Sequence, residues 1–152
     1  MVIRLPGPLA GELNDVAARG LRAIGQRLTA NRRAVLAILA DSDRPLTIHD
    51  ILAIRPDLAQ SSVYRTLVVL EQADVVHRVV TGGEFTRYEL TEDLTQHHHH
   101  LVCVACGSVQ DISAPPQLEQ SVRRVITQLA EQEGFSASTH RLDLIGLCRR
   151  CA

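Results

Sequence analysis

The sequence predicts an α+β fold in which an N-terminal winged helix-turn-helix domain precedes a small C-terminal α/β domain. Three observations support this prediction: helical periodicity in the first half of the chain, strand-like runs after Asp74, and two Cys-x-x-Cys pairs in the last third. With 152 residues, 45% of them hydrophobic, the chain can bury cores of this size. We place the boundary after Glu92, which gives predicted domains of residues 1–92 and 93–152.

Helical spacing of apolar residues predicts four helices in the first domain. They are expected over residues 12–24, 29–41, 47–56 and 63–73. Thr29 is a favourable N-cap for the second helix. Thr47 and Asp50 have the spacing of a capping box at the start of the third. Ser61 or Ser62 is expected to cap the fourth.

Two strands, residues 75–80 and 85–90, are expected next, around a turn at Gly82-Gly83. Three short helices followed by a β-hairpin form the winged helix-turn-helix arrangement, in which the last helix enters the major groove of DNA. The net charge of −1 does not itself favour nucleic acid, but residues 16–40 hold five arginines and no acidic residue. A small α+β domain with no role in DNA binding remains the alternative.

The second domain is predicted to be a β-β-α-β unit. After a polar linker at residues 91–96, we expect strands at 97–103 and 108–112, a helix at 116–133 and a strand at 138–147. Gly134 is expected to end the helix. The buried stripe of that helix is expected to consist of Leu118, Val122, Val125, Ile126 and Leu129. A unit this small needs a metal or a partner subunit for stability.

Four cysteines give the strongest chemical signal in the sequence. They form two Cys-x-x-Cys pairs, Cys103 with Cys106 and Cys148 with Cys151. Four thiolates fill a tetrahedral site and leave no open position, so the pattern predicts a structural zinc site. A redox-active or iron-bearing four-cysteine site is the alternative.

A run of four histidines, His97 to His100, leads directly into the first cysteine pair. In a strand, successive side chains point to opposite faces, so His98 and His100 share one face while His97 and His99 share the other. Each pair needs further donors, for which His49, His77, His140 and carboxylates are available. A purification tag or a low-complexity tract is the alternative, but the internal position beside a Cys-x-x-Cys pair favours metal binding.

Residues 97–107, the segment Val63-Tyr64-Arg65-Thr66-Leu67 and the final Cys-x-x-Cys together resemble the Fur superfamily of metal-responsive bacterial repressors. The resemblance covers about residues 16–151. It implies a homodimer with N-terminal winged helices and a C-terminal dimerisation domain, and double-stranded operator DNA as the partner.

The resemblance also assigns site residues. It implies that the four cysteines hold structural zinc. A regulatory site at the hinge between domains is expected from His77, Glu89, His98 and His100. An additional site is expected from His97, His99, Asp111 and His140, although Asp111 serves the hinge site in some relatives.

Pro45 stands where iron-type members have a histidine, whereas His77 occupies the position of a ligand in zinc-type members. The resemblance is therefore strongest to the zinc uptake regulator (Zur) branch. His49 has no counterpart in the family and is expected to be a surface or capping residue. The expected DNA contacts are Ser61, Ser62, Tyr64, Arg65, Arg32 and Arg33.

The expected function is zinc-responsive, DNA-binding repression of metal-uptake genes in the cytoplasm, since the sequence shows no signal peptide or membrane span. A regulatory site without cysteine also suits iron(II) or manganese, so an iron-, manganese- or peroxide-responsive regulator is the first alternative. A zinc module without an operator is the second. A metallohydrolase or deaminase is disfavoured because the sequence lacks His-Glu-x-x-His and His-x-Glu motifs.

Overall fold

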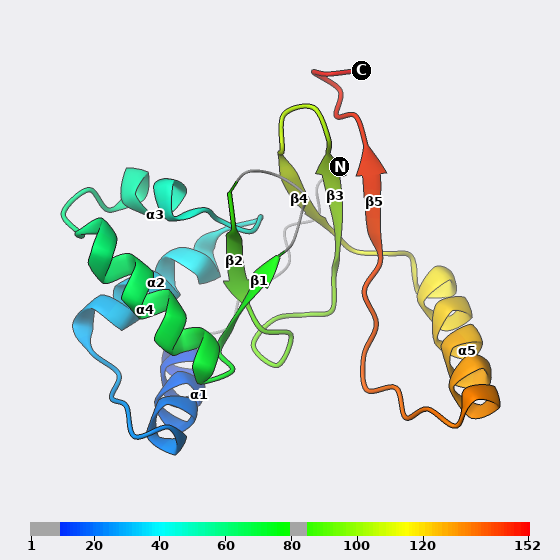
Figure 1. Ribbon diagram of the computed structural model, residues 1–152, viewed down its shortest axis with the longest axis horizontal. Helices are drawn as coiled ribbons and strands as arrows, with labels where there is room; N and C mark the ends of the chain where they lie inside the picture. Colours follow the sequence, from blue (N-terminus) through cyan, green and yellow to red (C-terminus); the bar gives the residue numbers. More distant parts are fainter. Residues whose placement is uncertain (1–9, 80–84) are drawn as a thin grey trace.

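The computed structural model describes residues 10–79 and 85–152 and has the predicted α+β class (Figure 1). Its elements are α1 (Ala10–Ala23), α2 (Ala30–Asp41), α3 (Ile48–Ile54), α4 (Gln60–Gln72), β1 (Val76–Val79), β2 (Arg87–Leu90), β3 (His99–Cys103), β4 (Val109–Ile112), α5 (Pro116–Glu133) and β5 (Asp143–Gly146). The predicted Gly82-Gly83 turn lies outside the described residues.

Two of the three predicted N-caps are confirmed. Thr29 accepts a hydrogen bond from the backbone of α2, and Thr47 forms a reciprocal capping box with Asp50 at the start of α3. The prediction for α4 was wrong: Ala59 is its N-cap and makes no side-chain hydrogen bond. The Ser62 hydroxyl instead accepts a hydrogen bond from Asn31 of α2, 3.2 Å away, so it joins two helices.

Helices α1, α2 and α4 pack around one aliphatic core. Its fully buried members include Leu21, Leu36 and Leu67. A close approach of α1 to the end of α4 depends on Gly20, where an added Cβ would lie 2.6 Å from the carbonyl oxygen of Ala73. Helices α3 and α4 also pack against each other and are joined by residues 55–59, as expected for the helix-turn-helix pair.

The hairpin that follows has the predicted antiparallel pairing. In β1 and β2 His77 lies opposite Glu89, and a two-residue bridge joins Leu46, just before α3, to Tyr88. The hairpin is therefore tied to the helix-turn-helix pair, and its far side faces the second sheet.

The second sheet has the order β4-β3-β5, with β4 antiparallel and β5 parallel to the central strand. Strand β5 covers only residues 143–146 and is shorter than predicted. Its pairing with β3 begins at Asp143, opposite His100, so residues 138–142 of the predicted strand are not part of it.

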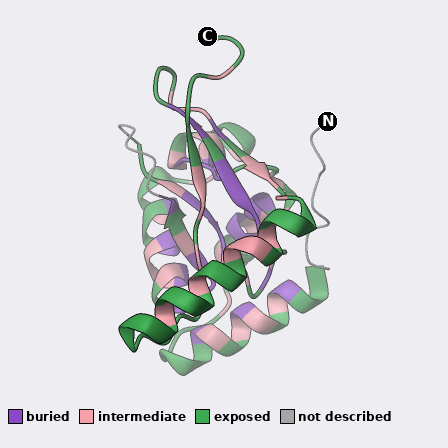
Figure 2. Ribbon diagram, turned by 90° about the vertical axis from the view of Figure 1, so that its right-hand side faces the viewer, coloured by how far each residue is buried: buried purple, intermediate pink, exposed green. Residues whose placement is uncertain are grey.

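The predicted buried stripe of α5 was wrong for the single chain. None of the residues of α5, all of which the structure describes, is buried, and Leu118, Val125 and Leu129 are 43% to 54% exposed. Figure 2, in which α5 lies in front, shows it in the colours of exposed and intermediate residues. An isolated chain provides no surface for this apolar side, although Gly134 ends the helix with a positive φ as predicted.

Candidate metal centres

Four buried or half-buried side chains meet between the hairpin and the second sheet, and we name them the hinge centre. They are Glu89, His98, His100 and Asp111, whose potential ligand atoms all lie within 4.8 Å of one another. The Oε2 atom of Glu89 is 3.3 Å from Nε2 of His98 and 3.1 Å from Nε2 of His100. A carboxylate from the winged-helix hairpin is thus joined directly to two imidazoles of the following sheet.

The alternation of β3 explains which histidines reach this centre. His98 and His100 are two residues apart and share a face, as the sequence predicted. Asp111 lies directly opposite His100 across the β3–β4 pair, with its Oδ1 atom 3.7 Å from Nε2. The sequence assignment placed Asp111 with His97 and His99. The structure instead groups it with the hinge centre.

His77 lies beside the hinge centre and touches it through Glu89. Its Nε2 atom is 2.7 Å from Oε1 of Glu89, and its side chain is partly exposed. It is not one of the four groups whose ligand atoms lie mutually close. The predicted proximity of His77 to Glu89 is therefore present, but His77 lies at the edge of the hinge centre.

The electrostatics of the hinge centre reflect burial opposed by hydrogen bonding. Burial alone would raise the pKa of Glu89, but hydrogen bonds with His100, His77 and His98 lower it below the usual range. Burial disfavours the charged form of His98, yet the adjacent Glu89 raises its pKa to about 9. For Asp111, burial and the nearby charge of Glu89 raise the pKa to about 6.

The donor set of the hinge centre suits a divalent cation. The Oδ1 atom of Asp111 is buried without a hydrogen-bond partner among the described residues, and a buried carboxylate oxygen of this kind needs a proton donor or a cation. Two imidazoles and two carboxylates match zinc, iron(II) or manganese.

A second group lies on the other face of β3, and we name it the outer centre. It consists of His97, His99, Glu119 and His140. Nε2 of His97 is 3.2 Å from Nε2 of His140, and His99 hydrogen bonds to Glu119. The Oε2 atom of Glu119 is buried without a hydrogen-bond partner in the described part of the chain, which again fits a cation.

Sequence reasoning missed Glu119 as a member of the outer centre. It lies in the first turn of α5, where an acidic residue is common because it favours the positive end of a helix. Because this role explains an acidic residue at that position, there was no reason to consider Glu119 as a metal ligand. The signal that could have found it is its position just after β4, which runs beside the histidine strand.

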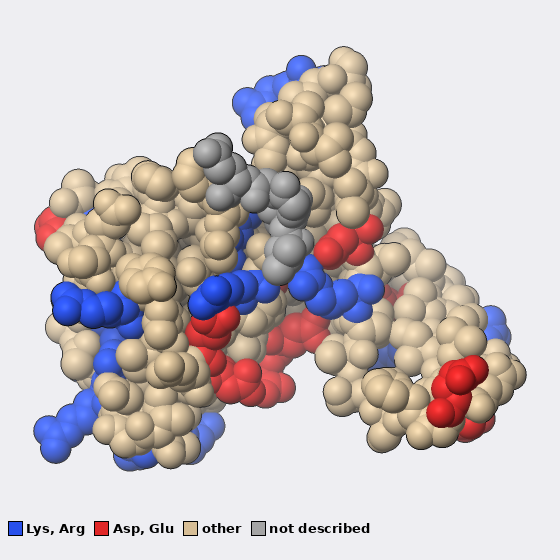
Figure 3. Space-filling model, in the orientation of Figure 1, with Lys and Arg blue, Asp and Glu red and all other residues tan. Residues whose placement is uncertain are grey.

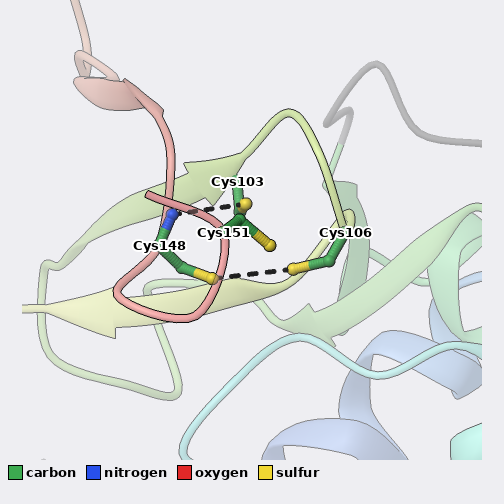
Figure 4. A group of neighbouring side chains, drawn as sticks. All are labelled: Cys103, Cys106, Cys148 and Cys151. Atoms are coloured by element: carbon green, nitrogen blue, oxygen red, sulfur yellow. Dashed lines mark hydrogen bonds between the residues drawn. The ribbon is translucent and has the colours of Figure 1, made fainter.

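All four cysteines meet at the far end of the second sheet, as predicted, and we name them the cysteine centre (Figure 4). The sulfurs of Cys106 and Cys148 are 3.8 Å apart, and the backbone N–H of Cys148 donates to the sulfur of Cys103. Gly107, with φ of 66°, allows the turn that closes the first pair.

Backbone N–H groups lower the pKa of Cys103 and Cys148, whereas hydrogen bonds with the neighbouring thiols raise the pKa of Cys151. Backbone N–H groups of Cys106 and Cys148 lower the pKa of Cys103 to about 6. Because the thiolate is the form that binds metal, this arrangement fits zinc with no open coordination position.

The predicted DNA contacts occupy one end of the helical half. Ser61, Tyr64 and Arg65 are exposed along α4, and Arg33 is exposed on α2. Arg32 is partly engaged, since its guanidinium donates to the Arg27 carbonyl and the Gln26 side chain.

Charge is unevenly distributed over the view in Figure 3. Many of its basic side chains lie over the helical half, and acidic side chains gather between the two halves. His49, outside the three centres, lies against Phe85 with ring centroids 5.3 Å apart, consistent with a surface position. No helix of the described residues has the length and apolar character needed to cross a membrane.

Comparisons with known proteins agree along most of the chain. The model of the ferric uptake regulator family matches residues 23–145. The ferric uptake regulation protein of Bacillus subtilis (strain 168) is 30% identical over 144 residues, which cover 90% of this chain and 93% of that protein. The peroxide operon regulator of the same organism is 30% identical over 149 residues, covering 94% and 95%.

Solved structures show the same fold. The ferric uptake regulator of Helicobacter pylori, described as having three functional metal-binding sites, aligns with a TM-score of 0.75 at 22% identity, covering 98% of this chain and 97% of that one. The Vibrio cholerae ferric uptake regulator aligns with a TM-score of 0.67 at 26% identity, covering 86% and 98%. A zinc-bound manganese uptake regulator gives 0.60 at 26% identity, covering 88% and 98%.

Proposed function

Because the chain belongs to the ferric uptake regulator family, we propose that it is a homodimeric, zinc-responsive transcriptional repressor that binds operator DNA upstream of metal-uptake genes. It is a cytoplasmic regulator and not an enzyme. Residues 1–92 form the DNA-binding domain, and residues 93–152 form the dimerisation and metal-binding domain.

The direct contact of Glu89 with His98 and His100 carries this proposal. The carboxylate belongs to the hairpin of the DNA-binding domain, whereas both imidazoles belong to the dimerisation domain. A cation held by donors from both sides binds best when the two domains have one relative orientation. Metal binding would therefore select the arrangement in which both winged helices of a dimer fit successive half-sites of an operator.

The required coupling is within reach of such a centre. To move a population from 1:99 to 99:1, the cation must favour the DNA-competent arrangement by about 5.5 kcal/mol. His77 assists from the rim, where it holds the second oxygen of Glu89 at 2.7 Å. The proximity of His77 is the feature that favours zinc, since it occupies the ligand position of zinc-type relatives.

Asp111 favours a second candidate, an iron(II)- or manganese-responsive regulator. With Asp111 in place the hinge centre offers two carboxylates, two imidazoles and no thiolate, and harder oxygen donors suit iron(II) and manganese. Competition titrations of the protein with zinc, iron(II) and manganese decide between the candidates. Tightest zinc binding together with zinc-dependent DNA binding supports the first.

The other two centres have separate roles in the proposal. The cysteine centre is a structural zinc site that joins the first strand of the second sheet to the chain after β5. The outer centre is an additional metal site that uses Glu119 instead of Asp111. DNA contacts come from α4 and α2, through Ser61, Ser62, Tyr64, Arg65, Arg32 and Arg33.

The hinge mechanism is tested with His98→Ala and Glu89→Gln proteins that retain zinc at the cysteine centre. In a gel shift with DNA from upstream of metal-transport genes, the unmodified protein should bind only when metal is supplied. Neither variant should bind the DNA when metal is supplied. His49→Ala, a histidine outside the three centres, is the matched control and should behave as the unmodified protein. Unchanged metal-dependent binding by both hinge variants would exclude the mechanism.

A further inference from the structure

We propose that Asp143 is a positioning residue of the hinge centre, which holds the His100 ring so that its Nε2 atom faces Glu89 and Asp111. This inference rests on the proposed function of the hinge centre, because it concerns the orientation of one of its ligands. Asp143 is not itself one of the four groups whose ligand atoms converge. It contacts the His100 ring at Nδ1, on the side away from Glu89.

The geometry places Asp143 behind His100. Its Oδ1 atom lies 3.2 Å from Nδ1 of His100, and its Oδ2 atom lies 3.0 Å from a guanidinium nitrogen of Arg141. His100 and Asp143 are also register partners in the parallel β3–β5 pair. Both carboxylate oxygens of Asp143 therefore have a partner, and the pairing of β5 with β3 holds Asp143 next to the His100 ring.

The second histidine of the hinge centre is held in the same way by the main chain. Nδ1 of His98 is 2.9 Å from the carbonyl oxygen of Gln96, and its Nε2 faces Glu89. A metal-binding histidine typically donates its other ring N–H to a carboxylate or a backbone carbonyl, which fixes the tautomer and strengthens the ligand. The hinge centre contains one example of each, and only the acceptor at His100 can be removed by substitution.

His99, on the other face of β3, shows that this support is not a general property of the strand. Nδ1 of His99 is buried and has no hydrogen-bond partner among the described residues. The two consecutive histidines of β3 thus differ: Nδ1 of His100 has a carboxylate behind it, whereas Nδ1 of His99 has none. Within the described part of the chain, only His97 of the outer centre is supported from behind, by Oε1 of Glu92 at 2.8 Å from its Nδ1, whereas both imidazoles of the hinge centre are supported in this way.

The first measurement is metal affinity of the full chain with zinc retained at the cysteine centre. Asp143→Ala should weaken zinc binding at the hinge centre by about 10- to 100-fold, the range expected for loss of a supporting hydrogen bond. Asp143→Asn should lose less, since its amide oxygen still accepts from Nδ1–H. Asp93→Asn is the matched control: Asp93 lines the same pocket as His100 and Asp143, but its carboxylate makes no hydrogen bond to a histidine in the described part of the chain.

The second measurement follows the ring directly. In the zinc-loaded protein, the Nδ1-bound proton of His100 should give a slowly exchanging NMR resonance that is lost in Asp143→Ala and kept in Asp143→Asn. A purely structural role would not predict this pattern. Unchanged cysteine-bound zinc and an unchanged melting temperature establish that the variants are folded.

The possible results separate the two proposals. If Asp143→Ala binds zinc as tightly as the unmodified protein, or weakens it no more than Asp93→Asn, the positioning role is overturned while the hinge mechanism stands. If His98→Ala leaves the zinc stoichiometry of the protein unchanged, the hinge centre is not a metal site and both proposals are overturned.

Discussion

The two halves of the chain are stabilised by different means. From α1 to β2, aliphatic side chains form one continuous core that includes Leu21, Leu36 and Leu67. In the C-terminal half, three of the buried residues are the consecutive His98, His99 and His100. Among the described residues α5 has no buried member. One half buries apolar groups, whereas the other brings together groups that bind metals.

This difference indicates where regulation can enter. Full burial of an aliphatic side chain contributes about 1.5–3 kcal/mol whatever the metal supply, so the helical half has no need of a ligand to fold. A small unit without such a core depends on metals or on a partner subunit. The stability of the C-terminal half is therefore conditional, which is the property that a metal sensor requires.

The largest expected effect is the loss of the cysteine centre. Cys148→Ala should unfold the C-terminal half and leave the helical half folded, because a structural zinc site contributes about 10–16 kcal/mol to folding in small zinc domains. Hydrogen exchange resolved by residue measures this, with rapid exchange expected in β3 to β5 and protection kept in α2 and α4. Protection of β3 to β5 in the zinc-free variant would show that this half does not depend on the metal.

A core truncation should produce the reverse pattern. Leu67→Ala removes a fully buried side chain from α4 and should lower the stability of the helical half by about 2–5 kcal/mol, while the cysteine centre keeps its zinc. Chemical denaturation and elemental analysis measure the two effects. Tyr64→Ala, on the exposed side of the same helix, is the matched control: it should change stability little and weaken operator binding.

The exposed apolar residues of the C-terminal half should be needed for dimerisation. Ile145 on β5 is 70% exposed in the single chain, so Ile145→Asp removes no internal packing but should weaken the dimer at least about 10-fold, or about 1.4 kcal/mol. Analytical ultracentrifugation measures the dimer dissociation constant. Ile54→Asp, an exposed apolar position on α3, should leave that constant unchanged. Equal effects of the two substitutions would argue against this interface.

The smallest expected effect concerns the capping box of α3, in the helical half. Burial opposes the ionisation of Asp50, but hydrogen bonds from Thr47 and Arg44 lower its pKa below the ordinary 3.8. Asp50→Ala should cost about 0.5–2 kcal/mol at neutral pH. A lowered folded-state pKa contributes stability above pH 3.8, and this stability is lost as the pH falls through the folded value.

Urea denaturation at pH 7 and at decreasing pH tests this prediction. The stability difference between Asp50→Ala and the unmodified protein should shrink toward low pH. Asp50→Asn, which retains an acceptor oxygen, should be less destabilised. A difference that stays constant with pH would assign the effect to helix propensity instead of to the carboxylate.

Local signals in the sequence predicted most of the architecture. The caps at Thr29 and Thr47 and the end of α5 at Gly134 depend on short-range spacing, and the structure confirms them. The division of the histidines between two faces needed only the alternation of a strand. These features do not depend on which distant segments lie side by side.

The remaining features depend on long-range pairing. Asp111 belongs to the hinge centre because it lies opposite His100, and a register between strands cannot be counted from sequence. Glu119 reaches the outer centre only through the placement of α5. The apolar side of α5 has helical periodicity, but the described elements of the single chain leave it exposed.

The histidine tract has a consequence for how such a protein changes over generations. Residues Leu101 to Cys103 fix the register of β3, so a gain or loss of one histidine codon shifts only the chain before the strand. The two positions of the hinge pair would still be filled by histidine, and the acceptor behind His98 is a backbone carbonyl that any preceding residue supplies. A one-codon deletion would remove an imidazole from the outer centre alone. Heritable variation in tract length can therefore alter one centre while the other is inherited intact.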